Sequence, residues 1–85
     1  MSRADKMLDA MRDNPRDWRI EDVIAICQRY GIKITPPRSG SHYKVRNPVS
    51  GAILPVPAAR PIKPVYIREL VAIIDQVRVQ AERVP

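Results

Sequence analysis

The residues best suited to chemistry lie in the segment 39–46, which contains His42, the only histidine of the chain. If this segment forms a strand, successive side chains point to opposite faces of a sheet. His42, Lys44 and Arg46 would then share one face, while the apolar side chains between them would face the core. Histidine can accept and donate a proton near neutral pH, and the two cations can hold a phosphate group. The spacing therefore predicts a site for a phosphorylated substrate.

Positive charge is concentrated around this histidine. The chain has 85 residues and a formal net charge of +6. Acidic and basic side chains balance in residues 1–31, whereas residues 32–68 contain no acidic side chain. The basic side chains of this middle segment are Lys33, Arg38, Lys44, Arg46, Arg60, Lys63 and Arg68. A field of one sign favours a polyanionic partner, most simply nucleic acid.

Two helices are predicted before the histidine. Apolar residues at helical spacing predict a helix over residues 3–13, which Asn14-Pro15 ends. A second helix follows Trp18 and ends before Gly31, a residue that readily caps a helix C-terminus. The predicted buried stripe of this second helix is Ile20, Val23, Ile24, Cys27 and Tyr30. Cys27 is interpreted as a small core residue rather than a reactive thiol.

Three strands and a last helix are predicted after it. Alternating apolar and polar residues predict strands over residues 32–35, 41–46 and 52–56, with a hairpin turn between the last two. Pro55 in the third strand and Pro57 just after it cannot donate to a neighbouring strand, which places this strand at a sheet edge or lets it fray. Pro64 begins a helix that runs to about residue 80.

The last helix is apolar on more than one face. Its main stripe consists of Ile67, Leu70, Val71, Ile74 and Val77. Val65, Ile73 and Val79 lie off this stripe, which predicts a second packing partner, either the N-terminal helix or another chain. The fold class is therefore predicted to be α+β, with the order α-β-β-β-α, an antiparallel three-stranded sheet and an extra N-terminal helix. Residues 1–18 form the extension and residues 19–80 the domain.

The surroundings of His42 favour RNA over other substrates. One histidine, one cysteine and a middle segment without carboxylates offer no ligand set for a metal. A Ser–His acyl-transfer pair through Ser39 or Ser41 lacks a carboxylate to orient the ring, and no phosphate-binding glycine motif is present. RNA supplies its own nucleophile, the 2′-hydroxyl. The protein then needs only proton transfer, from His42, and stabilisation of negative charge.

The order of several short motifs resembles the HicA family of toxins. Gly40-Ser41-His42 follows a helix that ends at Gly31 and a short strand. Val56-Pro57 comes later in the third strand, and Ile62-Lys63-Pro64 opens the last helix. The resemblance covers roughly residues 19–77.

This resemblance implies a fold, an activity and a partner. The family has a fold similar to double-stranded-RNA-binding domains (dsRBD-like). Its members are mRNA interferases, toxins of toxin–antitoxin systems that a cognate HicB antitoxin holds inactive. His42 falls on the family's catalytic histidine, and Gly40 and Ser41 fall on its invariant flank. The resemblance thus implies an endoribonuclease whose partners are mRNA and a HicB-like antitoxin.

The chain departs from the family pattern in three places. Many members have further histidines after the motif, and many have His-Pro after the Val-Pro of the third strand. This chain has Tyr43-Lys44 and Ala58-Ala59 at those places, and its first 18 residues exceed the compact family pattern. Because His42 is the only histidine, a mechanism with two histidines is excluded.

The predicted site combines the charge pattern with this resemblance. His42 is the predicted catalytic residue, with no metal and no small-molecule cofactor. The predicted RNA-binding residues are Gly40, Ser41, Lys44, Arg46, Arg38, Arg60 and Lys63. No segment resembles a signal peptide, and no apolar run approaches the roughly 18 residues of a membrane span. A cytoplasmic protein with no membrane partner is expected.

Two other functions fit part of the pattern. The same fold could bind double-stranded RNA or DNA without cutting it, since the basic segment supports binding and cleavage equally. Only His42, as a candidate catalytic residue, favours cleavage over binding without cleavage. A structural subunit that assembles through its apolar last helix explains neither the charge distribution nor the Gly40-Ser41-His42 step.

Overall fold

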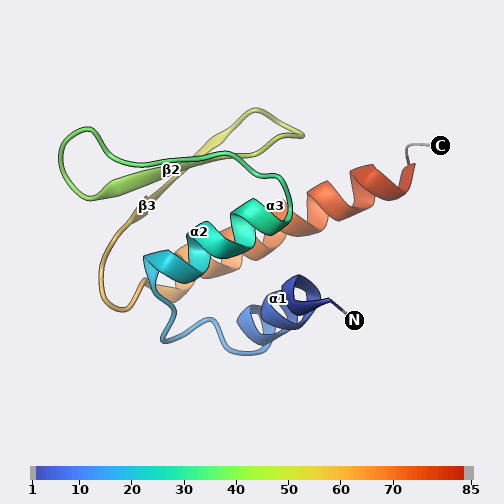
Figure 1. Ribbon diagram of the computed structural model, residues 1–85, viewed down its shortest axis with the longest axis horizontal. Helices are drawn as coiled ribbons and strands as arrows, with labels where there is room; N and C mark the ends of the chain where they lie inside the picture. Colours follow the sequence, from blue (N-terminus) through green and yellow to red (C-terminus); the bar gives the residue numbers. More distant parts are fainter. Residues whose placement is uncertain (1, 84–85) are drawn as a thin grey trace.

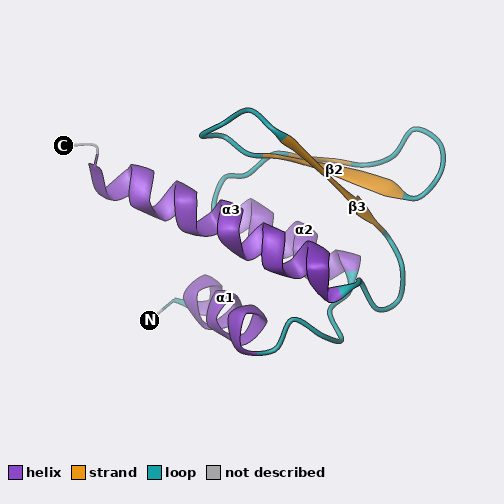
Figure 2. Ribbon diagram, turned by 180° about the vertical axis from the view of Figure 1, so that it is seen from behind, coloured by secondary structure: helices purple, strands orange, loops and turns teal. Residues whose placement is uncertain are grey.

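Three layers of secondary structure make up the part of the chain that the computed structural model describes, residues 2–83. A sheet lies on one side, helices α2 and α3 lie beneath it, and helix α1 lies on the far side from the sheet (Figure 1). The elements are α1 (Arg3–Asp13), α2 (Ile20–Arg29), β1 (Ile34–Thr35), β2 (His42–Arg46), β3 (Ile53–Pro57) and α3 (Pro64–Arg83). Figure 2 shows the same arrangement from behind. Within the described residues, the predicted α+β class with three helices and a three-stranded antiparallel sheet is confirmed.

The boundaries of several elements differ from the predicted ones by one to three residues. β1 begins at Ile34 instead of residue 32, because Ile32 belongs to the cap of α2. Gly31 adopts the left-handed conformation, with a φ of 67°, and the Ile32 N–H donates to the Cys27 carbonyl over 2.8 Å. That bond satisfies a carbonyl at the end of α2, as the Schellman arrangement does.

The two strands of the hairpin differ from the predicted ones by one residue, because β2 is shorter by one residue and β3 is displaced by one. β2 begins at His42 rather than residue 41, and β3 spans Ile53–Pro57 rather than residues 52–56. The Asn47 N–H donates to the Ala52 carbonyl over 2.8 Å, so residue 52 closes the turn. At the other end of α3, the helix continues to Arg83 instead of residue 80.

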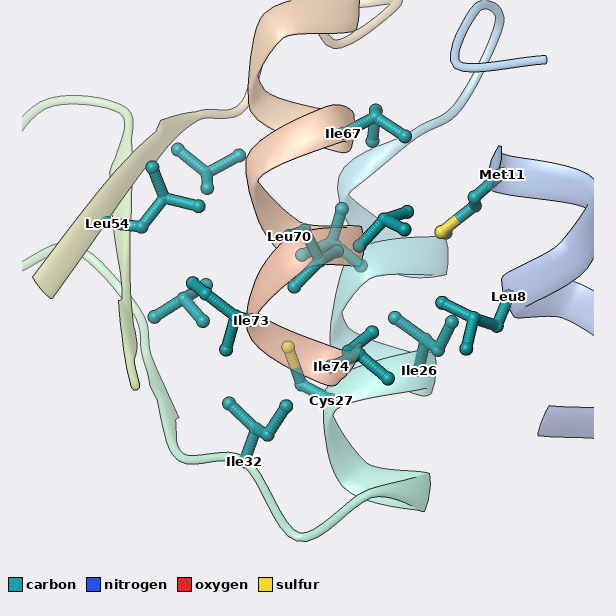
Figure 3. Close-up of a cluster of buried hydrophobic side chains, with 14 of the residues drawn as sticks. Leu8, Met11, Ile26, Cys27, Ile32, Leu54, Ile67, Leu70, Ile73 and Ile74 are labelled. Carbon is teal, nitrogen blue, oxygen red and sulfur yellow. The ribbon is translucent and has the colours of Figure 1, made fainter. Parts of the chain in front are cut away.

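One apolar core joins all three layers. Its members are Leu8, Met11, Val23, Ile26, Cys27, Ile32, Val45, Leu54, Val56, Ile62, Ile67, Leu70, Val71, Ile73 and Ile74. Figure 3 shows Ile26 beside Leu8 and Ile74, at the junction of the three helices. The predicted stripe of α2 omitted Ile26 and included Ile24, which is only half-buried. The prediction was wrong there because α2 contacts α1 as well as the rest of the core, so Ile26, beside Leu8 (Figure 3), belongs to its buried face.

Cys27 is a core residue, as predicted. Its side chain is fully buried, and burial raises the pKa of the thiol to about 12. The thiolate is the reactive form of cysteine, so this side chain is chemically inert near neutral pH.

Helix α1 is fastened to the other two helices by packing and by two polar contacts. Leu8 and Met11 are fully buried against the core. Arg12 donates two hydrogen bonds of 2.7 Å to the Asp75 carboxylate of α3. The Tyr30 hydroxyl donates to Asp5 over 2.8 Å. The second packing partner of α3 is therefore α1.

The three off-stripe residues of α3 have two different environments. Ile73 lies in the core and is only 8% exposed. Val65 and Val79 stay about half exposed, so α1 does not account for them.

We expect the contact between Tyr30 and Asp5 to make folding sensitive to alkaline pH. Burial and the bond to Asp5 raise the pKa of Tyr30 from 10.0 to about 12. A pKa that is higher in the folded state contributes stability that is complete below the unfolded pKa and is lost as the pH rises through the folded one. Tyr30→Phe should therefore lower the free energy of unfolding at pH 7 by about 1 kcal/mol. The variant should also lose less stability than the wild type between pH 10 and 12.

Urea unfolding at pH 7, 10 and 11.5 measures both effects. Tyr66→Phe is the matched control, because Tyr66 packs against the same core and its hydroxyl forms no hydrogen bond within residues 2–82. If the wild type and the Tyr30→Phe variant lost the same free energy of unfolding between pH 7 and 11.5, the proposed effect of the Tyr30–Asp5 contact would be contradicted.

Candidate nucleic-acid interface

The face of β2 that points away from the helices carries the predicted site residues His42, Lys44 and Arg46, called the basic row below. His42, Lys44 and Arg46 are exposed, whereas Val45 is fully buried and Tyr43 is half-buried. The predicted alternation is thus confirmed. The described helices all lie on the other side of the sheet, so this face is open (Figures 1 and 2).

β3 forms one edge of the sheet, as its prolines predicted. The strand order is β1-β2-β3, and His42 pairs with Pro57 and Lys44 with Pro55. The Ala58 N–H donates to the Ser41 carbonyl over 2.8 Å, so even-numbered residues of this segment bond to β2. In an antiparallel ladder the residues between them direct their backbone groups away from the partner strand. The nitrogens of both prolines therefore face the free edge, where a missing N–H costs no ladder bond.

Lys33, the residue just before β1, adds a cation to the open face that was not among the predicted binding residues. The Arg46 N–H donates to the Lys33 carbonyl over 3.0 Å, one residue before the pairing of Ile34 with Val45. Lys33 therefore lies directly opposite Arg46, and its side chain is exposed. Its position between the buried Ile32 and the half-buried Ile34 was the available signal, since alternation places it on the outer face.

The backbone before His42 is held at the end of the hairpin. Gly40 adopts a left-handed conformation with a φ of 80°, which favours glycine and turns the chain into β2. Ser41 follows, and the bond from Ala58 fixes its carbonyl. The His42 side chain is exposed and forms no hydrogen bond and no ion pair with any residue from 2 to 82. Its ring is therefore accessible to a ligand on the open face.

The other end of the hairpin is fixed by Asn47, which is only 5% exposed. Its side-chain oxygen accepts hydrogen bonds from the backbone N–H groups of Val49 and Ser50, and its amide donates to Gln76 of α3 over 2.8 Å. Arg46 lies next to this turn, and its guanidinium is 3.4 Å from the Gly51 carbonyl. The strand that carries the basic row is thus anchored at both ends.

The remaining predicted residues lie outside the row on β2. Arg38 is exposed in the loop between β1 and β2, and Lys63 is exposed immediately before α3. Arg60 lies in the loop after β3, where its guanidinium nitrogen is 3.9 Å from the Glu21 carboxylate at the start of α2. The structure therefore brings together Lys44, Arg46 and His42, with Arg60 turned toward a helix end.

Two further properties of the described chain bear on the site. Within residues 2–83, no three His, Cys, Asp or Glu side chains are grouped so that they could hold a metal ion. No helix in the described part is long and apolar enough to cross a membrane.

Comparison with protein-family models, with curated proteins and with solved structures gives no match for this chain. The residues of the site and the motif resemblance are therefore the indications of this chain's function.

Proposed function

We propose that this chain is a HicA-type toxin, a cytoplasmic endoribonuclease that cleaves mRNA without a metal ion and has a dsRBD-like fold. The observation that carries the proposal is a single accessible histidine on an open sheet face that has exposed cations and no carboxylate. Cations on this face attract the phosphate backbone, and histidine provides the proton transfer that RNA cleavage requires. The Gly40-Ser41-His42 step supports the same activity by its resemblance to the family.

The proposed reaction uses the 2′-hydroxyl of the RNA as the nucleophile. His42 removes its proton, and the oxygen attacks the adjacent phosphorus. The bond from phosphorus to the 5′-oxygen of the next nucleotide breaks, and that oxygen takes a proton from the imidazolium or from water. Lys44 and Arg46 stabilise the negative charge that accumulates on the phosphate oxygens. The products are a 2′,3′-cyclic phosphate and a free 5′-hydroxyl.

A direct experiment tests the function. Purified protein is incubated with RNA in excess EDTA, next to the His42→Ala variant. Cleavage by the wild type alone supports the proposal. Equal cleavage by both proteins, or none by either, would contradict it.

A HicB-like antitoxin must cover or neutralise the basic face to silence this site. An acidic partner surface would do so most readily, because opposite charges attract and accelerate encounter. We expect the association rate of such a partner to fall as salt is added, and Lys44→Ala to lower that rate. Stopped-flow association at several salt concentrations measures both effects. A complex whose contacts avoid His42, Lys44 and Arg46 would indicate inhibition by another route.

A further inference from the structure

The open face of the sheet has three cross-strand rows, each with a polar part and an apolar part. β2, together with β1 and the residue just before β1, supplies the cationic or hydrogen-bonding side chains, and β3 supplies an apolar one at every row. The rows are Lys33, Arg46 and Ile53; Thr35, Lys44 and Pro55; and His42 with Pro57. The face is therefore divided lengthwise, with charge on one half and apolar surface on the other.

The cross-strand pair of Lys33 and Arg46 indicates that the charged half of the face binds an anion. Like charges directly opposite each other on neighbouring strands destabilise a sheet. Residues 32–68 contain no carboxylate to compensate them, and both side chains are exposed on the same face. A phosphate between the two side chains would remove the repulsion and gain two charge-assisted contacts.

The spacing of the rows matches a nucleic-acid strand. Alternate residues of a β-strand are about 6.8 Å apart. This separation is close to that of successive phosphates along one strand. With the scissile phosphate at His42, the next phosphate falls at Lys44 and the one after it at Lys33 and Arg46. Arg38, on the other side of His42, lies in a loop outside this ladder.

The apolar half indicates that the bound nucleotides are unpaired. Ile53 is 44% exposed, and Pro55 beside it is exposed as well. These side chains offer no hydrogen bond to a second phosphate backbone. They do offer apolar contact to bases and riboses, which are accessible when a strand is single.

We propose that a single RNA strand lies along β2, with two consecutive phosphates on one side of the cut held by Lys44 and by the Lys33–Arg46 pair. The bases of these nucleotides lie over β3. The proposal rests on the proposed function only for the position of the cut at His42. It adds Lys33 and Ile53 as binding residues. It also requires that the strongly held phosphates lie on one side of the scissile phosphate only.

The experiment measures binding of a short RNA made uncleavable by a 2′-deoxy substitution at the cut. Each phosphate in turn is replaced by a neutral methylphosphonate, and affinity is measured by fluorescence anisotropy. The two largest losses should fall at consecutive phosphates on the same side of the cut. In the Lys33→Ala variant, the loss at the second of these phosphates should shrink, and the salt slope of binding should fall by about 0.7. Lys6→Ala, on the exposed surface of α1 far from the sheet, is the matched control and should change neither.

The outcomes separate this inference from the proposed function. Equal losses on both sides of the cut, or a Lys33→Ala variant that behaves like Lys6→Ala, would overturn the inference even if cleavage requires His42. Cleavage that survives in the His42→Ala variant would contradict the proposed function. The effect of Lys33→Ala on the affinity lost at each phosphate would still show how the strand binds. For the apolar half, Ile53→Ser should weaken single-strand binding without changing the salt slope. Tighter binding of the matching duplex than of the single strand would contradict unpaired recognition.

Discussion

The His42→Ala variant is expected to cleave RNA about 10² to 10⁴-fold more slowly than the wild type, the range typical for loss of a general acid–base group. Its fold and RNA affinity should change little. The His42 side chain is exposed and belongs to no buried cluster, so its removal leaves no cavity. Lys44 and Arg46 remain to hold the phosphates. Single-turnover cleavage, thermal unfolding and anisotropy measure the three quantities separately.

Two further measurements distinguish proton transfer from a structural role. His42→Gln keeps a hydrogen-bonding side chain but cannot accept a proton near neutral pH, so it should be as inactive as His42→Ala. Added imidazole should restore part of the cleavage by His42→Ala, because the open face lets a free ring reach the vacated position. A His42→Gln variant with wild-type cleavage would contradict the acid–base role. Tight binding by a wild type that never cuts RNA or DNA would instead favour the non-catalytic binding module.

The sequence was a good guide to the fold where one periodicity dominated. Apolar spacing placed α1, Pro64 placed the start of α3, and the prolines of β3 placed that strand at an edge. The errors lie where two parts of the fold compete for one residue. Ile32 alternates like a strand residue, but the cap after Gly31 takes its N–H. Ile26 lies off the simplest stripe, and its burial depends on α1, whose docking position the local pattern does not contain.

The prediction of the site was limited in the same way, because a local pattern does not contain the contacts between elements. Alternation along β2 was sufficient to put His42, Lys44 and Arg46 on one face, because that prediction needs only one strand. Placing Lys33 opposite Arg46 needs the register between two strands, which pairs Ile34 with Val45 and which alternation along one strand does not contain. Arg60 carries the same charge as the row residues, yet its loop directs it toward Glu21. Charge counted along the chain therefore identifies the region of the site but not its members.

A single 2′-deoxy substitution at the cut site is expected to abolish cleavage at that position while leaving binding nearly unchanged. The proposed reaction has no attacking group other than the 2′-hydroxyl. The basic row contacts phosphates, which the substitution leaves in place. Cleavage of the unmodified RNA should continue in excess EDTA, since residues 2–83 offer no cluster of ligands that would hold a divalent ion near His42. Denaturing gels with end-labelled RNA measure cleavage, and anisotropy measures binding.

The chemistry of the product ends identifies the nucleophile independently of the protein. Attack by the 2′-hydroxyl produces a 2′,3′-cyclic phosphate and a free 5′-hydroxyl, which polynucleotide kinase can label without prior phosphatase treatment. Attack by water would instead leave a 5′-phosphate or a 3′-phosphate without a cyclic intermediate. A 5′-phosphate product would show that water is the nucleophile, and activity that disappears in EDTA would show that cleavage requires a metal ion. Either result would contradict metal-independent attack by the 2′-hydroxyl.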